Sequence, residues 1–143
     1  MLIRPFEGRD LDAVMELWLQ SNLQAHPFIA PSWWMEHLEE VKSLIPQAEV
    51  YVHESSGVTD AFLGLMGEGD IAGLFVDARR RGEGIGKALL DHAKSLYPAL
   101  TLSVYERNEG AIRFYRREGF VLTNTRPEQE TGERECIMWW KRR

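Results

Sequence analysis

The chain has 143 residues, of which 44% are hydrophobic and 27% are charged, and its formal net charge is −5. A chain of this length builds one core without disulfide or metal support, so we expect residues 1–143 to form a single domain. Its one cysteine, Cys136, excludes an intrachain disulfide. The negative charge argues against nucleic acid as the main partner, because duplex binding depends on a basic surface.

The longest stretch without charged residues, 17–35, is too polar and too interrupted by proline to be a membrane span. The opening residues Met1–Pro5 lack the basic and apolar regions of a secretory signal. We therefore expect no membrane partner, and a cytoplasmic location follows by elimination.

Apolar spacing and turn residues predict the elements in chain order. The first half is expected to hold a strand at 2–6, a helix capped by Asp10, a loop at 26–29, a helix from Pro31 that Pro46 ends, and strands at 50–52 and 61–66 around a turn at 55–57. The second half is expected to hold a strand at 70–77, a glycine-rich loop, a helix at 85–96, a strand at 100–104, a short helix from Asn108 to Gly119, and a closing antiparallel pair at 120–123 and 136–140 around a polar loop at 124–134. This order predicts an α/β domain with a mixed sheet, because the hairpin-like middle excludes simple double winding.

The glycine-rich loop is the first motif that carries chemistry. It runs Arg79-Arg80-Arg81-Gly82-Glu83-Gly84-Ile85-Gly86-Lys87 and joins an apolar strand to a helix. Free backbone N–H groups at a helix start bind anions, which favours a phosphate or pyrophosphate ligand over a simple turn. Lys87 breaks the dinucleotide fingerprint, and Arg81 and Ala88 break the Walker A pattern.

Two motifs in the right order resemble the GNAT superfamily of N-acetyltransferases. The spacing Arg81-x-x-Gly84-x-Gly86 is similar to its acetyl-coenzyme A loop, and residues 108–120 are similar to its signature N-x-x-A-x-x-F-Y-x-x-x-G-F. The resemblance implies a mixed, mostly antiparallel sheet of about seven strands flanked by about four helices. It also implies direct acetyl transfer from acetyl-coenzyme A to an amine. Ala78 stands where many members carry proline, and we expect no functional effect from it.

A narrower resemblance, to small bacterial acetyltransferases of the YiaC and YjaB type, rests on four segments. These are Glu16-Leu17-Trp18-Leu19, His26-Pro27-Phe28-Ile29, Gly84-Ile85-Gly86-Lys87-Ala88-Leu89 and Val104-Tyr105. The resemblance implies a lysine or peptide amine as acceptor. A small-molecule amine is the alternative acceptor, and a non-catalytic acyl-coenzyme A sensor or subunit is the alternative function. A monomer and a homodimer both remain open.

The resemblance also implies which residues bind the coenzyme. Phe75 and Val76 would hold the pantetheine arm by strand-like backbone hydrogen bonds. The pyrophosphate cradle would be formed by Gly82, Gly84, Ile85, Gly86 and Lys87, with charge from Arg81 and from Arg79 or Arg80. Asn108 is expected near the pantetheine, although it could equally be a plain helix N-cap.

Tyr115 matches the family tyrosine that acts as general acid, and its alternative role is core packing. For the general base, Asp70 or Glu68, His26 and a chain of water molecules all remain open. His26, Trp34 and Tyr105 are the candidates for acceptor binding, with Trp33 expected in the core and Trp34 at the rim. The four histidines show no metal-ligand spacing, so no metal is expected, and Cys136 is expected to pack as a small apolar residue.

Overall fold

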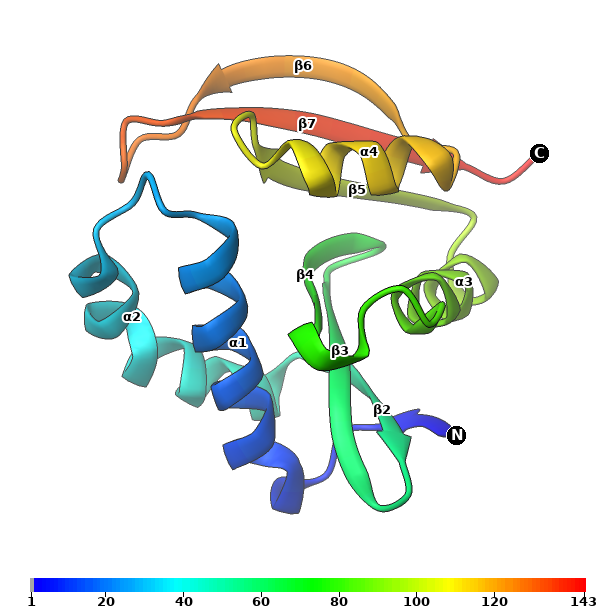
Figure 1. Cartoon of the computed structure of the whole chain (residues 1–143). Coiled ribbons are helices and arrows are strands. Elements are labelled where there is room, and N and C mark those ends of the chain that lie inside the picture. Colours follow the sequence, from blue (N-terminus) through cyan, green and yellow to red (C-terminus); the bar gives the residue numbers. More distant parts are fainter. Residues whose placement is uncertain (1) are drawn as a thin grey trace.

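The computed structural model describes residues 2–143, which form one mixed sheet with helices on both faces (Figure 1). The strands and helices are, in chain order, β1 (Leu2–Pro5), α1 (Leu11–Ala25), α2 (Pro31–Leu44), β2 (Glu49–Ser55), β3 (Val58–Met66), β4 (Asp70–Val76), α3 (Ile85–Leu96), β5 (Ala99–Tyr105), α4 (Glu109–Arg117), β6 (Val121–Pro127) and β7 (Arg134–Lys141). Short 3₁₀ turns at Gly8–Asp10, Ile45–Gln47 and Ala78–Arg80 complete the order. The α/β, seven-stranded, four-helix expectation is confirmed.

The sheet has the order β1-β2-β3-β4-β5-β7-β6, and every neighbouring pair is antiparallel except β4 and β5. The parallel pair is short, because only Asp70 and Ile71 of β4 stand opposite residues of β5. Beyond Ile71 the two strands separate, and Figure 1 shows β5 crossing away from β4. The sheet is therefore continuous at one end of β4 and open at the other.

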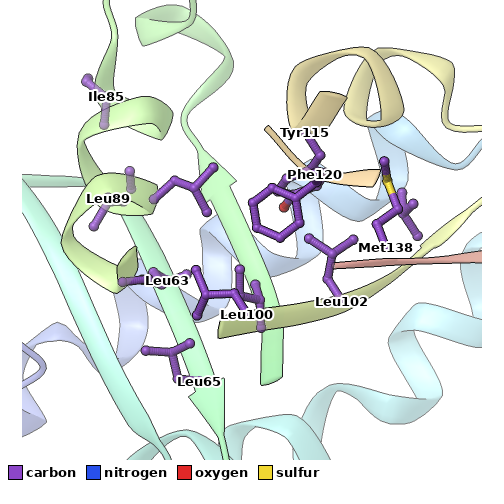
Figure 2. Close-up of a cluster of buried hydrophobic side chains, with 14 of the residues drawn as sticks. Leu63, Leu65, Ile85, Leu89, Leu100, Leu102, Tyr115, Phe120 and Met138 are labelled. Carbon is purple, nitrogen blue, oxygen red and sulfur yellow. The ribbon is translucent and has the colours of Figure 1, made fainter. Parts of the chain in front are cut away.

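Alternation along the strands divides the core into two clusters. On one face, Leu63 and Leu65 of β3 and Leu100 and Leu102 of β5 pack under α3 and α4, as Figure 2 shows. On the other face, Phe62 of β3 joins the cluster under α1 and α2. Cys136 is buried in the first cluster, as expected. None of the helices in residues 2–143 is long and apolar enough to cross a membrane.

Asp10 does not cap α1 with its side chain, which corrects the expectation from sequence. Its carboxylate instead accepts hydrogen bonds from Arg4 Nη1 at 2.8 Å and Nη2 at 2.9 Å, and from the Glu7 backbone N–H at 2.8 Å. The Arg4 guanidinium lowers the pKa of this buried carboxyl. Asp10 therefore ties β1 to the turn that precedes α1. At the end of α2, Pro46 does not stop the helix alone, because the chain tightens into a 3₁₀ turn from Ile45.

The closing hairpin is longer than expected, because the polar segment 124–134 is not all loop. β6 extends to Pro127 and β7 starts at Arg134, which leaves residues 128–133 as the connection. β6 is an edge strand and is mostly exposed, so it lacks the apolar alternation that marks a strand in sequence. A register shift between Leu122 and Asn124 further disturbs the pattern.

Candidate active site

The opening between β4 and β5 leaves backbone groups of β4 without a strand partner. Asp77 donates its backbone N–H to the Asp60 carbonyl of β3 at 2.8 Å. Because alternate residues of a strand direct their N–H and C=O groups to opposite edges, Leu74 and Val76 present theirs to the opening. Phe75 pairs with Phe62 of β3 instead. The predicted strand-like docking edge is therefore made by Leu74 and Val76, and Phe75 contributes its side chain.

A cavity of about 610 Å³ lies beside this edge and extends over the glycine-rich loop. It is lined by Leu74, Phe75, Val76, Arg80, Arg81, Gly82, Gly84, Ile85, Gly86, Lys87, Asn108, Tyr115 and residues of α1 and α4. Gly82 and Gly84 have φ of +80° and +83°, which only glycine adopts without strain. Gly84 is the N-cap of α3 and lines the cavity, so this cavity lies at a helix start, where free backbone N–H groups favour anions.

The three arginines before the glycines have different surroundings. Arg80 and Arg81 line the cavity. Arg79 does not: its side chain is 87% exposed and pairs with Asp77 at 2.9 Å. The sequence leaves open whether Arg79 or Arg80 adds charge to that of Arg81. In the structure only Arg80 lies with Arg81 beside the cavity. Lys87 also reaches the cavity rim, where its Nζ pairs with Glu118 at 3.0 Å.

A second cavity of about 310 Å³ opens on the far side of the gap, between the ends of β4 and β5. It shares six residues with the first cavity: His26, Leu74, Phe75, Asn108, Ala111 and Tyr115. Its other walls come from α1, α2, β4, β5, the β6–β7 connection and β7, and they include Trp34, Tyr105, Glu128 and Glu135. The two cavities therefore form two lobes of one site that meet at the shared residues.

Tyr115 lies at this junction, on α4. Burial raises the pKa of its hydroxyl, so the phenol stays protonated at neutral pH. Its ring packs edge-on against Phe114 at 5.1 Å and Phe120 at 5.4 Å between centroids, and Figure 2 shows Tyr115 beside Phe120. Tyr115 therefore packs in the core with its ring and also lines both lobes of the site.

Asn108 and His26 form the other side of the junction. The Asn108 side-chain oxygen accepts from the Ala111 backbone N–H at 3.2 Å, so Asn108 is the N-cap of α4, and it lines both lobes. Its Nδ2 lies 3.3 Å from His26 Nε2. Burial lowers the pKa of His26 to about 4, so the ring is neutral at pH 7 and accepts this hydrogen bond. His26 is therefore a neutral wall of the site that orients Asn108.

Aromatic rings continue the wall towards the second cavity. His26 stacks on Trp34 at 5.3 Å between centroids and meets Tyr105 edge-on at 5.0 Å. Trp34 is buried and Trp33 is partly exposed, which reverses the expected core and rim positions. Adjacent helical residues point about 100° apart, so the docking of α2 decides which ring is covered.

Two carboxylates that line the second cavity were not anticipated from sequence. Glu135 is bound by Arg126 at 2.8 Å. Glu128 has no cationic partner among the described residues; its Oε1 accepts from the Tyr105 hydroxyl at 3.5 Å and its Oε2 accepts the backbone N–H of Thr131 at 3.2 Å. Burial raises the pKa of Tyr105 to about 12. No spacing rule marks these glutamates, because strand pairing at the hairpin end brings them to the site.

Asp70 and Glu68, the acidic candidates for the general base, line neither lobe. Both are exposed, and Asp70 accepts from the Thr101 hydroxyl at 3.3 Å at the paired end of β4. A strand rises roughly 3.3 Å per residue, so Asp70 lies on the order of 15 Å along β4 from Phe75. The structure therefore does not bring these two residues to the junction.

Comparison with known proteins agrees with this geometry. Residues 46–122 match the acetyltransferase (GNAT) domain family. The chain is 34% identical over 140 residues to the peptidyl-lysine N-acetyltransferase YiaC of Escherichia coli, covering 97% of this chain and 96% of that one. It is 33% identical over 136 residues to the peptidyl-lysine N-acetyltransferase YjaB of Salmonella typhimurium, covering 92% and 90%.

The solution structure of apo YjaB from Escherichia coli has the same fold, with a TM-score of 0.87, 27% identity, and coverage of 99% of this chain and 98% of that one. The fold and the matching family are those of an acyl-group transferase. The chain belongs to the GNAT family of N-acetyltransferases, which confirms the resemblance of its two motifs.

Proposed function

We propose that residues 1–143 form one enzyme domain that transfers the acetyl group of acetyl-coenzyme A to a lysine side chain of a protein or peptide. The observation that carries this proposal is the meeting of an anion-binding lobe and an acidic, aromatic lobe at Tyr115. The relatives named peptidyl-lysine N-acetyltransferases, which align over nearly the whole chain, support the acceptor.

The coenzyme lobe fits acetyl-coenzyme A in three respects. The free edge of Leu74 and Val76 suits the amides of the pantetheine arm, as an added strand would. The amides of Gly84, Ile85 and the next residues of α3 suit the pyrophosphate, and Arg80 and Arg81 add positive charge. Acetyl-coenzyme A supplies the thioester, and these residues hold it with its reactive end towards the junction.

We assign the general acid to Tyr115. Its hydroxyl is protonated because burial raises its pKa, and it lines both lobes at their junction. A proton passed from this hydroxyl to the departing sulfur would stabilise the leaving group. The surrounding Phe114 and Phe120 rings hold the phenol in place and exclude water.

We assign the binding of the acceptor amine to the lobe that contains Glu128. A lysine amine has an ordinary pKa of about 10.4, so it arrives as an ammonium ion and must lose a proton before it attacks. Glu128 lacks a cationic partner among residues 2–143 and therefore offers a negative charge to this ammonium. Its carboxylate also gives the released proton a path away from the junction, directly or through water.

The direct experiment is to incubate the protein with acetyl-coenzyme A and a library of lysine peptides, and to detect acetylated peptides by mass spectrometry. Parallel reactions contain spermidine in place of peptide, which tests the small-amine alternative. Acetylation of lysine peptides supports the proposal. Acetylation of spermidine alone would replace the acceptor, and coenzyme binding without turnover on any amine would favour the sensor alternative.

A test of the acceptor lobe uses Glu128→Gln, with Glu130→Gln on the same connection as the control. Glutamine keeps the size of Glu128 and its acceptor oxygen but removes the charge. Because hydrogen bonds to charged groups contribute about 1.5–3 kcal/mol, KM for a lysine peptide should rise roughly tenfold or more. Glu130 is exposed and lines neither lobe, so its variant should behave as wild type. An unchanged KM in Glu128→Gln would remove this residue from acceptor binding.

A further inference from the structure

A buried carboxylate lies behind the coenzyme lobe, outside the residues that line it. Asp60 of β3 is 3% exposed, and its Oδ1 lies 2.6 Å from Nδ1 of His53 on β2, which is also 3% exposed. The other oxygen, Oδ2, is buried and has no hydrogen-bond partner within residues 2–143. A buried carboxylate needs a compensating partner on both oxygens, so the free Oδ2 needs a physical explanation.

The nearest cation to this oxygen is Arg80, which lines the coenzyme lobe. Arg80 Nε lies 3.7 Å from Asp60 Oδ2, and it too is buried without a hydrogen bond in the described chain. Arg80 Nη2 is held separately, donating to the Ser55 hydroxyl at 3.3 Å and pairing with Glu83 at 3.4 Å. The guanidinium is thus held along one side by groups of β2, β3 and the loop itself.

The remaining nitrogen of the fork is free. A guanidinium carries donors on Nε, Nη1 and Nη2 in fixed planar geometry. Nε faces Asp60 and Nη2 faces Ser55 and Glu83, whereas Nη1 makes no hydrogen bond within residues 2–143. Because the planar group is fixed on one side, Nη1 is a pre-oriented donor for an anion in the lobe that Arg80 lines.

Asp60 also anchors the chain just before the loop. Its backbone carbonyl accepts from the N–H of Asp77, the residue that follows β4. One residue of β3 therefore holds both the backbone at the start of the loop and the side chain of Arg80. His53 contacts the other carboxylate oxygen, Oδ1, so both oxygens of Asp60 lie beside a polar group.

We propose that Asp60, supported by His53, is a positioning residue that holds Arg80 so that its Nη1 binds a phosphate of the coenzyme. This inference rests on the proposed coenzyme lobe, and it adds a buried residue that no loop motif contains. The ligand chemistry is a phosphoanhydride or phosphate ester rather than the pantetheine arm. The binding of a thiol that lacks phosphates should therefore not depend on Asp60.

The test measures the dissociation constants of coenzyme A and of pantetheine, which lacks the phosphates, by calorimetry. Asp60→Asn should weaken coenzyme A about tenfold, the equivalent of about 1.4 kcal/mol, and should leave pantetheine unchanged. Arg80→Ala should produce the same pattern. The double variant should bind coenzyme A no more weakly than Arg80→Ala, because Asp60 acts only through Arg80.

Arg80→Lys serves as a second variant if Asp60→Asn does not fold. Lysine keeps the charge but cannot hold Asp60, Ser55 and a phosphate in one plane, so it should also weaken coenzyme A. Arg79→Ala, an exposed neighbour that does not line the lobe, is the matched control and should bind as wild type.

Three results would overturn the inference. The first is unchanged coenzyme A affinity in Asp60→Asn or Arg80→Lys. The second is an equal loss of affinity for coenzyme A and for pantetheine. The third is a double variant whose loss of coenzyme A affinity is the product of the losses in the two single variants. Failure of the wild-type protein to bind coenzyme A would be a different result. It would remove the proposed coenzyme lobe, and this inference with it.

Discussion

At the scale of single residues, the proposed chemistry depends on groups whose protonation is set by burial. Tyr115 stays a neutral phenol because burial raises its pKa, and His26 stays a neutral imidazole because burial lowers its pKa to about 4. A phenol can then donate a proton, whereas this histidine is a poor base at neutral pH. In the proposed chemistry, Tyr115 is the acid at the junction, and the lobe that contains Glu128 would take up the proton of the amine.

The Tyr115 assignment predicts a large effect from removal of one oxygen atom. Tyr115→Phe keeps the ring that packs on Phe114 and Phe120. General acid catalysis contributes roughly 100- to 10,000-fold, so kcat should fall by at least about 100-fold while coenzyme affinity changes little. Steady-state kinetics that follow the formation of acetylated peptide measure this change. A melting curve checks that the variant is folded. Turnover equal to wild type would exclude Tyr115 as the acid.

The lowered pKa of His26 predicts a pH dependence of stability. The unfolded chain takes up a proton on this histidine near pH 6.5, whereas the folded chain does so near pH 4. Stability from this residue is complete above about pH 6.5 and decreases as the pH falls towards about 4.

The comparison is between wild type and His26→Gln in denaturant unfolding. Between about pH 7 and about pH 5, the wild type should lose about 2 kcal/mol more than the variant. Other titrating groups are common to both proteins and cancel. Equal losses in the two proteins would show that His26 is not buried as the structure has it.

The residues that sequence could not assign are those whose surroundings come from other elements. The family signature at 108–120 points to Tyr115 and Asn108, because that motif is local in sequence. Asp70 lies at the paired end of β4, away from the junction, and only the pairing of the strands shows this. The order of Trp33 and Trp34 depends on how α2 docks, which their own neighbours in sequence do not specify.

At the scale of elements, we assign coenzyme recognition to the strand–loop–helix unit from β4 to α3. Its features are local: two glycines with positive φ and a helix start with free N–H groups. They were therefore predictable from sequence. β6 was not fully predictable, because an exposed edge strand lacks the apolar alternation that marks a strand, and Glu128 follows it directly.

The loop predicts different outcomes for two equivalent substitutions. Gly84→Asp and Gly57→Asp both place a side chain at φ near +80°, and a Cβ meets no atom within 4 Å at either site. Each should cost about 1–2 kcal/mol of backbone strain and add one negative charge. Only Gly84→Asp puts that charge at the anion site, so it alone should abolish stabilisation by acetyl-coenzyme A in a melting experiment. If both variants lost the stabilisation by acetyl-coenzyme A, backbone strain and not charge at Gly84 would explain the loss.

At the scale of the whole molecule, the sheet is held closed at one end and open at the other. The parallel pairing of β4 with β5 stops after Ile71, where the two strands separate (Figure 1). Both lobes of the site are lined by residues beside this opening. This opening depends on pairing between strands that are distant in sequence. The order of elements predicts the α/β class, but only the folded sheet shows where β4 and β5 separate.

The central claim is that this opening binds acetyl-coenzyme A, and the shift in melting temperature on ligand addition tests it most directly. A ligand at about 100 times its dissociation constant stabilises the folded state by about 2.7 kcal/mol, which raises the melting temperature of a domain this size by roughly 8–10 °C. The account predicts such a rise with acetyl-coenzyme A and none with NAD or ATP at the same concentration. No rise at millimolar acetyl-coenzyme A, or an equal rise with ATP, would contradict it.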